Sequence, residues 1–293
     1  MRSVIYIVFF FIVCALASCG NTGKAKTDET LDSLETRNKA QRIGYIILSK
    51  PEVDLSDFEK DKEGFIHIFN GENFLGWRGY GKDIVPDNWS VEDGAIKING
   101  TGRGMAHDEN GGDIIFQYQF KNFELKFDYK VAKGGDSGVF YLAQEVQTFD
   151  PASGRLKMEP IYISAPEAQI LDNENHVNGR TGKDGNRQSM SLVDMLPAKP
   201  QNSKPYGEWN EAGIIVYKGL AIHRQNGVDV LEYNLWTPQW IELLQSGKFS
   251  KENWPLAFEL LKDAGGSNQK GYIGLQDCGD DVWFRNIRIK ILD

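Results

Sequence analysis

The sequence predicts an all-β domain, either a β-sandwich or a β-barrel. The chain contains many short β-prone runs, few stretches with helical spacing, and 31 glycines, many of them at turn positions. Short strands separated by glycine-containing turns are typical of sandwiches and barrels. About 250 residues follow the N-terminal segment, and this length suits one large all-β domain.

Residues 1–18 predict a lipoprotein signal peptide. Arg2 precedes an apolar run over residues 4–13, which is too short to span a membrane. Small residues then lead directly to Cys19 and resemble the lipobox of bacterial lipoproteins. This resemblance implies lipidation of Cys19 and a position in the periplasm or on the surface of a Gram-negative bacterium. A plain signal peptide with an incidental cysteine is the alternative.

The remaining cysteines and the charge narrow the class of protein. After loss of Cys14 with the signal and lipidation of Cys19, Cys278 stands alone, so we expect no intrachain disulfide and a fold stabilised by its core. The formal net charge is −8, with scattered Lys and Arg residues, which argues against nucleic-acid binding. Residues 19–42 predict a flexible polar tether, 43–63 a lead-in segment, and 64–293 the folded domain.

The first half of the domain predicts strands joined by tight turns. Residues 65–77 form a strand that enters a turn at Asn70-Gly71, and residues 88–100 form a hairpin around Asp93-Gly94. A glycine-rich loop over 102–112 carries Arg103, His107 and Asp108, and a strand follows at 114–120. Residues 122–132 alternate between apolar and charged side chains and predict a half-buried strand. A turn and another strand follow over 134–146.

The second half predicts strands with a helical interruption. A long loop covers 173–205, and three strands over 208–235 turn at Lys218-Gly219 and Asn226-Gly227. Thr237, followed by proline, predicts a helix over 237–249. A second short helix ends at Gly265-Gly266. Strands over 271–279 and 281–292 close the chain, with a bulge expected near Arg285-Asn286.

Residues 166–176, PEAQILDNENH, are the most informative segment. In an extended strand Glu167 and Gln169 share one face, while Ala168 and Ile170 share the other and can pack into a core. Burial of an unpartnered polar group costs about 2–7 kcal/mol, so a carboxylate beside an amide suits a concave sheet face that holds a polar ligand. An ordinary solvated face is the alternative.

Six motifs together resemble a known family. They are FIHIFNGENFLGW, DSGVFYLAQE, PEAQILDNENH, KPYGEWNEAGIIVYKG, HRQNG and IGLQDCGDDVWFRNIRIK, in this order between residue 64 and the C-terminus. They resemble the 3-keto-disaccharide hydrolase domain family of Bacteroidetes. The resemblance implies a concanavalin-like jelly roll of two antiparallel sheets. It also implies a hydrolase or lyase acting on glycosides whose glucosyl C3 is a ketone, which a separate sugar 3-dehydrogenase would produce.

This chemistry needs a base, an acid and groups that hold the sugar. A C3 ketone acidifies the C2 proton, and we expect Glu167 to act as base or acid. His176, Arg187 and Asp277 are candidates for the complementary acid, the enolate clamp or a metal ligand. Further candidates for substrate binding are Gln169, Asp172, Arg187, Trp209 and Gln276.

Structural alternatives accompany several of these residues. His176 could cap its asparagine-rich turn, Asp172 could form an Asx-turn, and Trp209 could belong to the core. We expect structural roles for His67 and His223. Many family members have His at the position of Cys278, and if that His is an acid or a metal ligand, Cys278 could change or abolish the chemistry; a lone Cys can also be a small buried hydrophobe. Many members also have Asn at the position of Asp136, and some have Arg near Leu142, so Arg-dependent contacts do not carry over.

Metal and cofactor signals are weak, and two other functions fit the sequence. Asp172 and His176 are four residues apart, but in a turn and not on a helix face. We expect no cofactor and leave a divalent metal open. The same fold hosts non-catalytic carbohydrate-binding modules, and an ordinary two-carboxylate glycosidase is the other alternative.

Overall fold

The computed structural model describes residues 44–100 and 111–293. The predicted signal peptide, Cys19, the tether and the part of the glycine-rich loop with Arg103, His107 and Asp108 lie outside the described residues. Within the described residues, no helix has the length and apolar character needed to cross a membrane.

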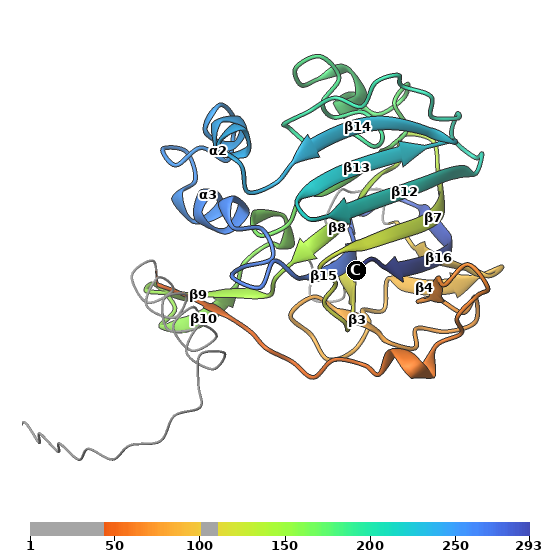
Figure 1. Ribbon diagram of the computed structural model, residues 1–293, viewed down its shortest axis with the longest axis horizontal. Coiled ribbons are helices and arrows are strands. Elements are labelled where there is room, and N and C mark those ends of the chain that lie inside the picture. The colour runs from red at the N-terminus through yellow and green to blue at the C-terminus, as the bar shows by residue number, and fades with distance from the viewer. Residues whose placement is uncertain (1–43, 101–110) are drawn as a thin grey trace, which may run out of the picture.

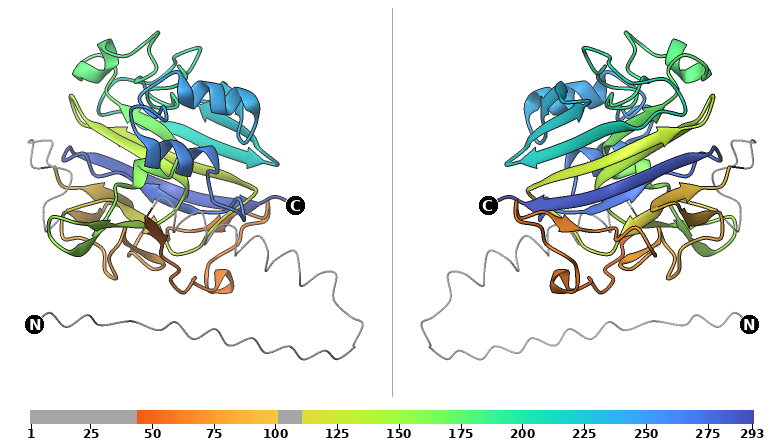
Figure 2. Two further views of the ribbon diagram at one scale, coloured as in Figure 1. Left: turned by 90° about the vertical axis from the view of Figure 1, so that its left-hand side faces the viewer. Right: turned by 90° about the vertical axis from the view of Figure 1, so that its right-hand side faces the viewer.

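Two antiparallel sheets form the body of the molecule, as the sequence predicts (Figures 1 and 2). The large sheet has the order β14-β13-β12-β7-β16-β5-β4, and β2 also pairs with β16. Its strands are β2 (Ile66–His67), β4 (Trp89–Glu92), β5 (Ala95–Ile98), β7 (Phe123–Val131), β12 (Asn210–Tyr217), β13 (Leu220–Gln225), β14 (Val228–Asn234) and β16 (Val282–Ile291). The small sheet has the order β11-β8-β15-β6-β3. Its strands are β3 (Trp77–Gly79), β6 (Ile114–Phe116), β8 (Asp136–Ala143), β11 (Glu167–Leu171) and β15 (Tyr272–Leu275).

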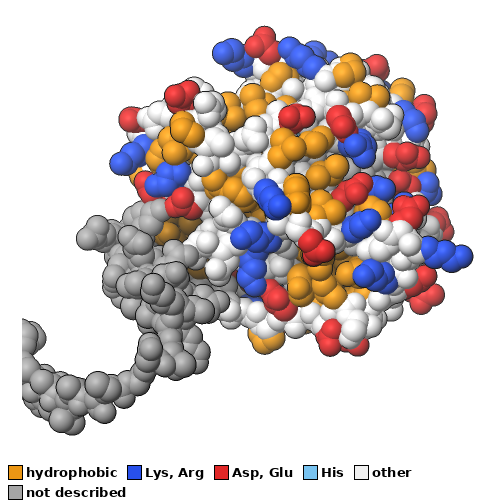
Figure 3. All heavy atoms as spheres, viewed as in Figure 1, with side chains coloured by type: hydrophobic (Ala, Val, Ile, Leu, Met, Phe, Trp, Pro, Cys, Tyr) orange, Lys and Arg blue, Asp and Glu red, His pale blue; other side chains and the backbone are white. Residues whose placement is uncertain are grey.

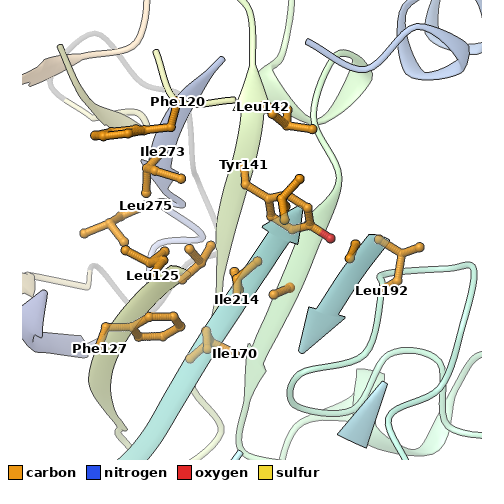
Figure 4. Close-up of a cluster of buried hydrophobic side chains, with 14 of the residues drawn as sticks. Phe120, Leu125, Phe127, Tyr141, Leu142, Ile170, Leu192, Ile214, Ile273 and Leu275 are labelled. Atoms are coloured by element: carbon orange, nitrogen blue, oxygen red, sulfur yellow. The ribbon is translucent and has the colours of Figure 1, made fainter. Parts of the chain in front are cut away.

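The main core lies between the two sheets (Figure 4). Every second residue of β7 is buried, including Leu125 and Phe127. Ile170 of β11 and Ile273 of β15 face these side chains from the small sheet. Full burial of one such side chain stabilises the folded state by about 1.5–3 kcal/mol. The apolar side chains therefore face the core, and the period of two leaves the opposite face of the strand for function.

A polar group of three side chains is built into this core. His223 donates from Nδ1 to the Met190 carbonyl at 2.8 Å, and its Nε2 accepts from the Tyr141 hydroxyl at 2.7 Å. Tyr233 hydrogen-bonds to the same Tyr141 hydroxyl. Burial lowers the pKa of His223 to about 4, so the imidazole is neutral. The structure gives His223 the structural role that we expected.

A third, three-stranded sheet at the side was not predicted. It has the order β1-β9-β10, from β1 (Tyr45–Ile47), β9 (Val146–Asp150) and β10 (Arg155–Met158). Three of the four β10 residues are exposed, so this strand has no buried face to produce an alternating pattern. The partner of β1 lies about a hundred residues further along the chain, which local patterns do not reveal.

The two predicted helices form a compact insertion after β14. The Thr237 side chain accepts from Trp240 N and caps α2 (Pro238–Gln245), and α3 (Pro255–Lys262) ends before Gly265. Figures 1 and 2 show both helices side by side at one end of the sandwich. The other side of α3 contacts the short 3-10 helix η2 (Ile161–Ile163). The bulge in β16 is also confirmed, since its register shifts after Arg285 and Asn286 has φ 53°.

Candidate active site

β11 and β8 place polar groups on the outer face of the small sheet. Ala168 and Ile170 are fully buried in the core, so Glu167 and Gln169 point to the opposite face. Gln169 pairs with Gly138 of β8. The Glu167 side chain lies over this glycine, because an added Cβ at Gly138 would stand 2.9 Å from Glu167 Cδ. The missing side chain at Gly138 therefore makes the space that the carboxyl group occupies.

Glu167 is a carboxyl group that favours its neutral form. Only 9 % of the residue is exposed. Burial, reinforced by the negative charge of Asp136, raises the pKa of Glu167 to about 8, while the positive charge of Lys248 opposes the rise. At neutral pH Glu167 therefore carries a proton that it can donate.

Asp136, at the start of β8, is the second carboxyl group of this face. It accepts from Asn178 Nδ2 at 2.9 Å and from Gln169 Nε2 at 3.3 Å. Burial raises the pKa of Asp136 to about 6, and the nearby His176 and the Asn178 hydrogen bond limit the rise. Asp136 is therefore mostly ionised at neutral pH, in contrast to Glu167.

His176 both caps a turn and faces Asp136. Its Nδ1 accepts from Asn178 N at 3.1 Å at the start of η3 (Val177–Arg180). A neutral imidazole that accepts through Nδ1 carries its proton on Nε2. His176 Nε2 lies 3.7 Å from Asp136 Oδ2, so the ring presents this proton toward the carboxylate. His176 thus caps its turn, as the structural alternative has it, and also lies beside Asp136.

The segment after β15 borders the site and contains Gln276, Asp277 and Cys278. Gln276 N donates to the Gly138 carbonyl at 2.9 Å, and Cys278 Sγ donates to Gln276 Oε1 at 3.0 Å. Burial, together with the negative charges of Asp136 and Glu167, raises the pKa of Cys278. Cys278 is therefore a neutral thiol beside the two carboxyl groups.

Asp277 is engaged in fixing the chain. Its Oδ2 accepts from Asn88 Nδ2 at 2.7 Å and from Gly112 N at 2.8 Å, and its Oδ1 accepts from Gly279 N at 3.0 Å. Its backbone N donates to Asp113 Oδ1 at 2.9 Å. Burial raises the pKa of Asp113 to about 7. The structure thus places Asp277 near the site, with both carboxylate oxygens occupied.

The two-helix insertion brings a cation to the Glu167 end of this face. Lys248, which follows α2, binds Asp194 Oδ2 through Nζ at 2.7 Å. The same Nζ lies 5.6 Å from the ring centroid of Tyr162, in η2. Asp194 belongs to the chain segment that runs along the outer edge of β11, where Val193 N donates to the Glu167 carbonyl at 3.2 Å.

Residues 64–290 match the profile of the 3-keto-alpha-glucoside-1,2-lyase-like domain. The chain belongs to this family. The resemblance drawn from the six sequence motifs is therefore confirmed.

Individual relatives of the lyase-like domain extend this match. A curated Bacteroides thetaiotaomicron protein named 3-keto-disaccharide hydrolase is 54% identical over 294 residues, which cover 98% of this chain and 99% of the relative. A crystal structure of a candidate glycosyl hydrolase from Parabacteroides distasonis has 28% identity and a TM-score of 0.61, and the match covers 79% of this chain and 95% of that one. A second such structure from the same organism has 26% identity, a TM-score of 0.50, and coverage of 74% and 99%.

Three substrate-binding candidates have other contacts in the lyase-like domain: Asp172 and Arg187 bind loop residues, and Trp209 lies at the other sheet. Asp172 accepts from the backbone N of Gly134 and from Asn175 Nδ2, both at 2.8 Å, which is an Asx-type turn role. Arg187 pairs with Asp194. The Cζ atom of Arg285 lies 3.9 Å from the centroid of the Trp209 ring, on the outer face of the large sheet. The thickness of the sandwich therefore separates Trp209 from Glu167.

Charges of both signs are interspersed on the face of the lyase-like domain shown in Figure 3. Over residues 44–100 and 111–293, no group of three or more His, Cys, Asp and Glu side chains is arranged to hold a metal ion.

Asp136, Lys248 and Tyr162 are the site residues that sequence reasoning missed. Asp136 follows Gly134-Gly135 and therefore resembles a turn residue, although the parity of β8 places it on the same face as Gly138. Lys248 and Tyr162 reach the site only through the folding of the insertion and η2, for which the sequence carries no local signal.

Proposed function

We propose that this chain cleaves the glycosidic bond of 3-keto-glycosides, in particular 3-keto-disaccharides, by removal of the C2 proton and elimination of the C1 substituent. The name of the 54% identical relative supports the substrate class, and the match to a lyase-like family supports the reaction type. The proposal assigns the acid and the base to residues of this chain.

The observation that carries the proposal is the opposite protonation of two neighbouring carboxyl groups. The pKa of Glu167 is raised to about 8 and that of Asp136 to about 6. Around neutral pH the outer face therefore offers one protonated acid and one ionised base. Two titratable groups whose environments separate their pKa values in this way are the usual sign of an acid and base assignment.

The reaction then needs only these two proton transfers. The Asp136 carboxylate removes the C2 proton, and the electron pair enters the C3 ketone as an enolate. When the enolate collapses, the C1–O bond breaks and Glu167 donates its proton to the leaving oxygen. The products are an alcohol and a sugar with a C1=C2 double bond conjugated to the ketone. Addition of water across that bond would give the 3-keto sugar, so lyase and hydrolase share the first half-reaction.

The surrounding side chains hold the base in position. Gln169 donates to one oxygen of Asp136 and Asn178 to the other. The proton on His176 Nε2 faces the same carboxylate. These donors stabilise the ionised form of Asp136 before the reaction and orient its remaining lone pairs toward the substrate.

The proposal places the chain after an oxidation step and at the cell envelope. A separate sugar 3-dehydrogenase must supply the ketone, because neither carboxyl group can oxidise an alcohol. The lipobox before Cys19 supports attachment to the membrane by a lipid, in the periplasm or on the cell surface.

Turnover of a 3-keto-glucoside with a chromogenic aglycone, beside its unoxidised parent and with and without a chelator, tests the function. We expect release of the aglycone from the keto form alone. Equal release from the parent would indicate an ordinary glycosidase, and binding of the sugar without release would indicate a carbohydrate-binding module. Either result would overturn the proposal, and loss of activity with chelator would show a need for metal.

A further inference from the structure

The proposed base and acid lie toward opposite ends of β11 on the outer face of the small sheet. The inference drawn from this order rests on the proposed function. Asp136 pairs with Leu171 at one end of β11, and Glu167 lies at the other end, four residues away. The Glu167 side chain leans back over Gly138 toward Asp136. If Asp136 takes the C2 proton and Glu167 protonates the C1 oxygen, the leaving group continues beyond Glu167, away from Asp136.

Tyr162 and Lys248 lie in this direction. η2, which carries Tyr162, precedes β11 by a few residues and contacts both β8 and α3. The negative charges of Asp113 and Glu167 contribute to a raised pKa of the Tyr162 hydroxyl, after burial itself. The Lys248 side chain, 44% exposed, lies over the Tyr162 ring. The two residues thus present an aromatic ring and an ammonium group next to the proposed acid.

We propose that Tyr162 and Lys248 form the subsite for the leaving group, and that the two-helix insertion thereby selects which alcohol is released. The occupant that fits is a second sugar. The apolar face of a pyranose packs on an aromatic ring, and an ammonium group donates to hydroxyl oxygens. A small alcohol such as methanol leaves the subsite empty.

The subsite is held in place from several sides. Asp194 accepts from Lys248 and also pairs with Arg187. The Tyr162 ring packs edge-on against Trp254, at 5.8 Å between centroids, and Trp254 stacks on Phe249 at 6.3 Å. This packing fixes the ring from the insertion side, so binding of a sugar needs little further ordering.

The charged groups that face Glu167 come from four elements. Asp136 of β8, Asp113 before β6 and Asp194 of the loop favour its neutral form, while Lys248 of the insertion opposes them. Removal of the Lys248 charge raises the pKa of Glu167 further. Because Glu167 is already protonated at pH 7, the acid remains competent there, and an effect of Lys248 on the leaving group can be measured separately.

Two substrates and a matched control test the inference at pH 7. We would compare kcat/KM for a 3-keto-disaccharide and for methyl 3-keto-glucoside in the wild type, Lys248→Met, Tyr162→Leu and Lys251→Met. Lys251 is exposed in the same connecting segment as Lys248 and serves as the control. We expect Lys248→Met and Tyr162→Leu each to lower the value for the disaccharide by about tenfold or more. The value for the methyl glycoside should stay within about twofold, and Lys251→Met should change neither.

The outcomes separate this inference from the proposed function. Equal losses on both substrates, or no loss on the disaccharide in Lys248→Met, would overturn the subsite while the function stands. Because Tyr162→Leu removes packing, its thermal unfolding is measured in parallel, and Lys248→Met decides the matter if Tyr162→Leu fails to fold. Failure of the wild type to release either alcohol would overturn the function and the subsite together.

Discussion

Two acidic side chains on adjacent strands acquire different chemistry from their surroundings. Glu167 is buried with a glycine beneath it, and both burial and the charge of Asp136 favour its neutral form. Asp136 is equally buried but receives hydrogen bonds from Asn178 and Gln169. The environments, and not the residue types, therefore decide which group we propose as the acid and which as the base.

The pH dependence of kcat/KM follows from these two pKa values. Asp136 must be ionised, so activity rises as the pH increases through about 6. Glu167 must be protonated, so activity falls as the pH increases through about 8. We expect a bell-shaped profile with its maximum between these values, measured with the keto substrate. A profile that is still rising above pH 9 would contradict the assignment of Glu167 as the acid.

Gly138 is expected to be essential for the position of Glu167. A methyl group at this position would lie 2.9 Å from Glu167 Cδ, so Gly138→Ala must displace the carboxyl group. We expect a fall in kcat of about 10- to 100-fold with the fold retained, since displacement of a catalytic group by about 1 Å has effects of this size. Gly213→Ala, in a strand of the large sheet, is the control. Wild-type turnover by Gly138→Ala would show that Glu167 has no need of this space.

Sequence reasoning named Glu167 and Gln169 as candidates because the period of two in EAQIL separates their face from that of Ala168 and Ile170. It named His176 and Gln276 as candidates from two of the family motifs, PEAQILDNENH and IGLQDCGDDVWFRNIRIK. It placed Trp209 as a sugar platform, whereas the structure shows this ring on the opposite side of the sandwich. An aromatic residue next to a strand gives no local signal of which sheet its strand will join.

At the level of elements, tight turns made most of the fold predictable. Positive φ values at Asp93-Gly94, Lys218-Gly219 and Asn226-Gly227 correspond to the hairpin turns that the sequence indicates. The side sheet β1-β9-β10 remained hidden because its strands are short, β10 is mostly exposed, and β1 lies far from β9 in the chain. The two helices were visible from their caps, but their contact with η2 depends on tertiary packing.

Asp277 is expected to join elements and not to transfer protons. It accepts from the side chain of Asn88, from Gly112 N and from Gly279 N. Asp277→Ala would leave buried donors unpaired, at about 1–3 kcal/mol each, so we expect a Tm lower by about 4 °C or more. Asp87→Ala, an exposed neighbour of Asn88, is the control. An unchanged Tm with complete loss of turnover would instead make Asp277 a catalytic residue.

At the level of the whole molecule, the core that stabilises the fold and the proposed site lie on opposite faces of the small sheet. The core between the sheets, with its Tyr141, His223 and Tyr233 group, supports the outer face of the small sheet, on which the proposed acid and base lie. Family membership accounts for the sandwich and the order of motifs. The proposed leaving-group subsite depends on the insertion, which follows β14 and is not part of either sheet.

The N-terminus predicts how the whole molecule is held at the envelope. Lipidation of Cys19 should bring the protein into the membrane fraction of its native host, and Cys19→Ser should release it into the soluble fraction. Fractionation with mass spectrometry of the mature N-terminus measures both. Cys278→Ser is the matched control and should leave the distribution unchanged. A soluble wild-type protein without lipid would exclude the anchor.

The most direct test of the central claim separates the two proton transfers. A 3-keto-glucoside is incubated in D₂O with the wild type, Glu167→Gln or Asp136→Asn, and NMR follows deuterium at C2 and release of the alcohol, with an enzyme-free control. Glu167→Gln should exchange the C2 proton without releasing the alcohol, because the base remains and the acid is gone. Asp136→Asn should do neither. Release at the wild-type rate by Glu167→Gln, or exchange at the wild-type rate by Asp136→Asn, would contradict the assignment of acid and base.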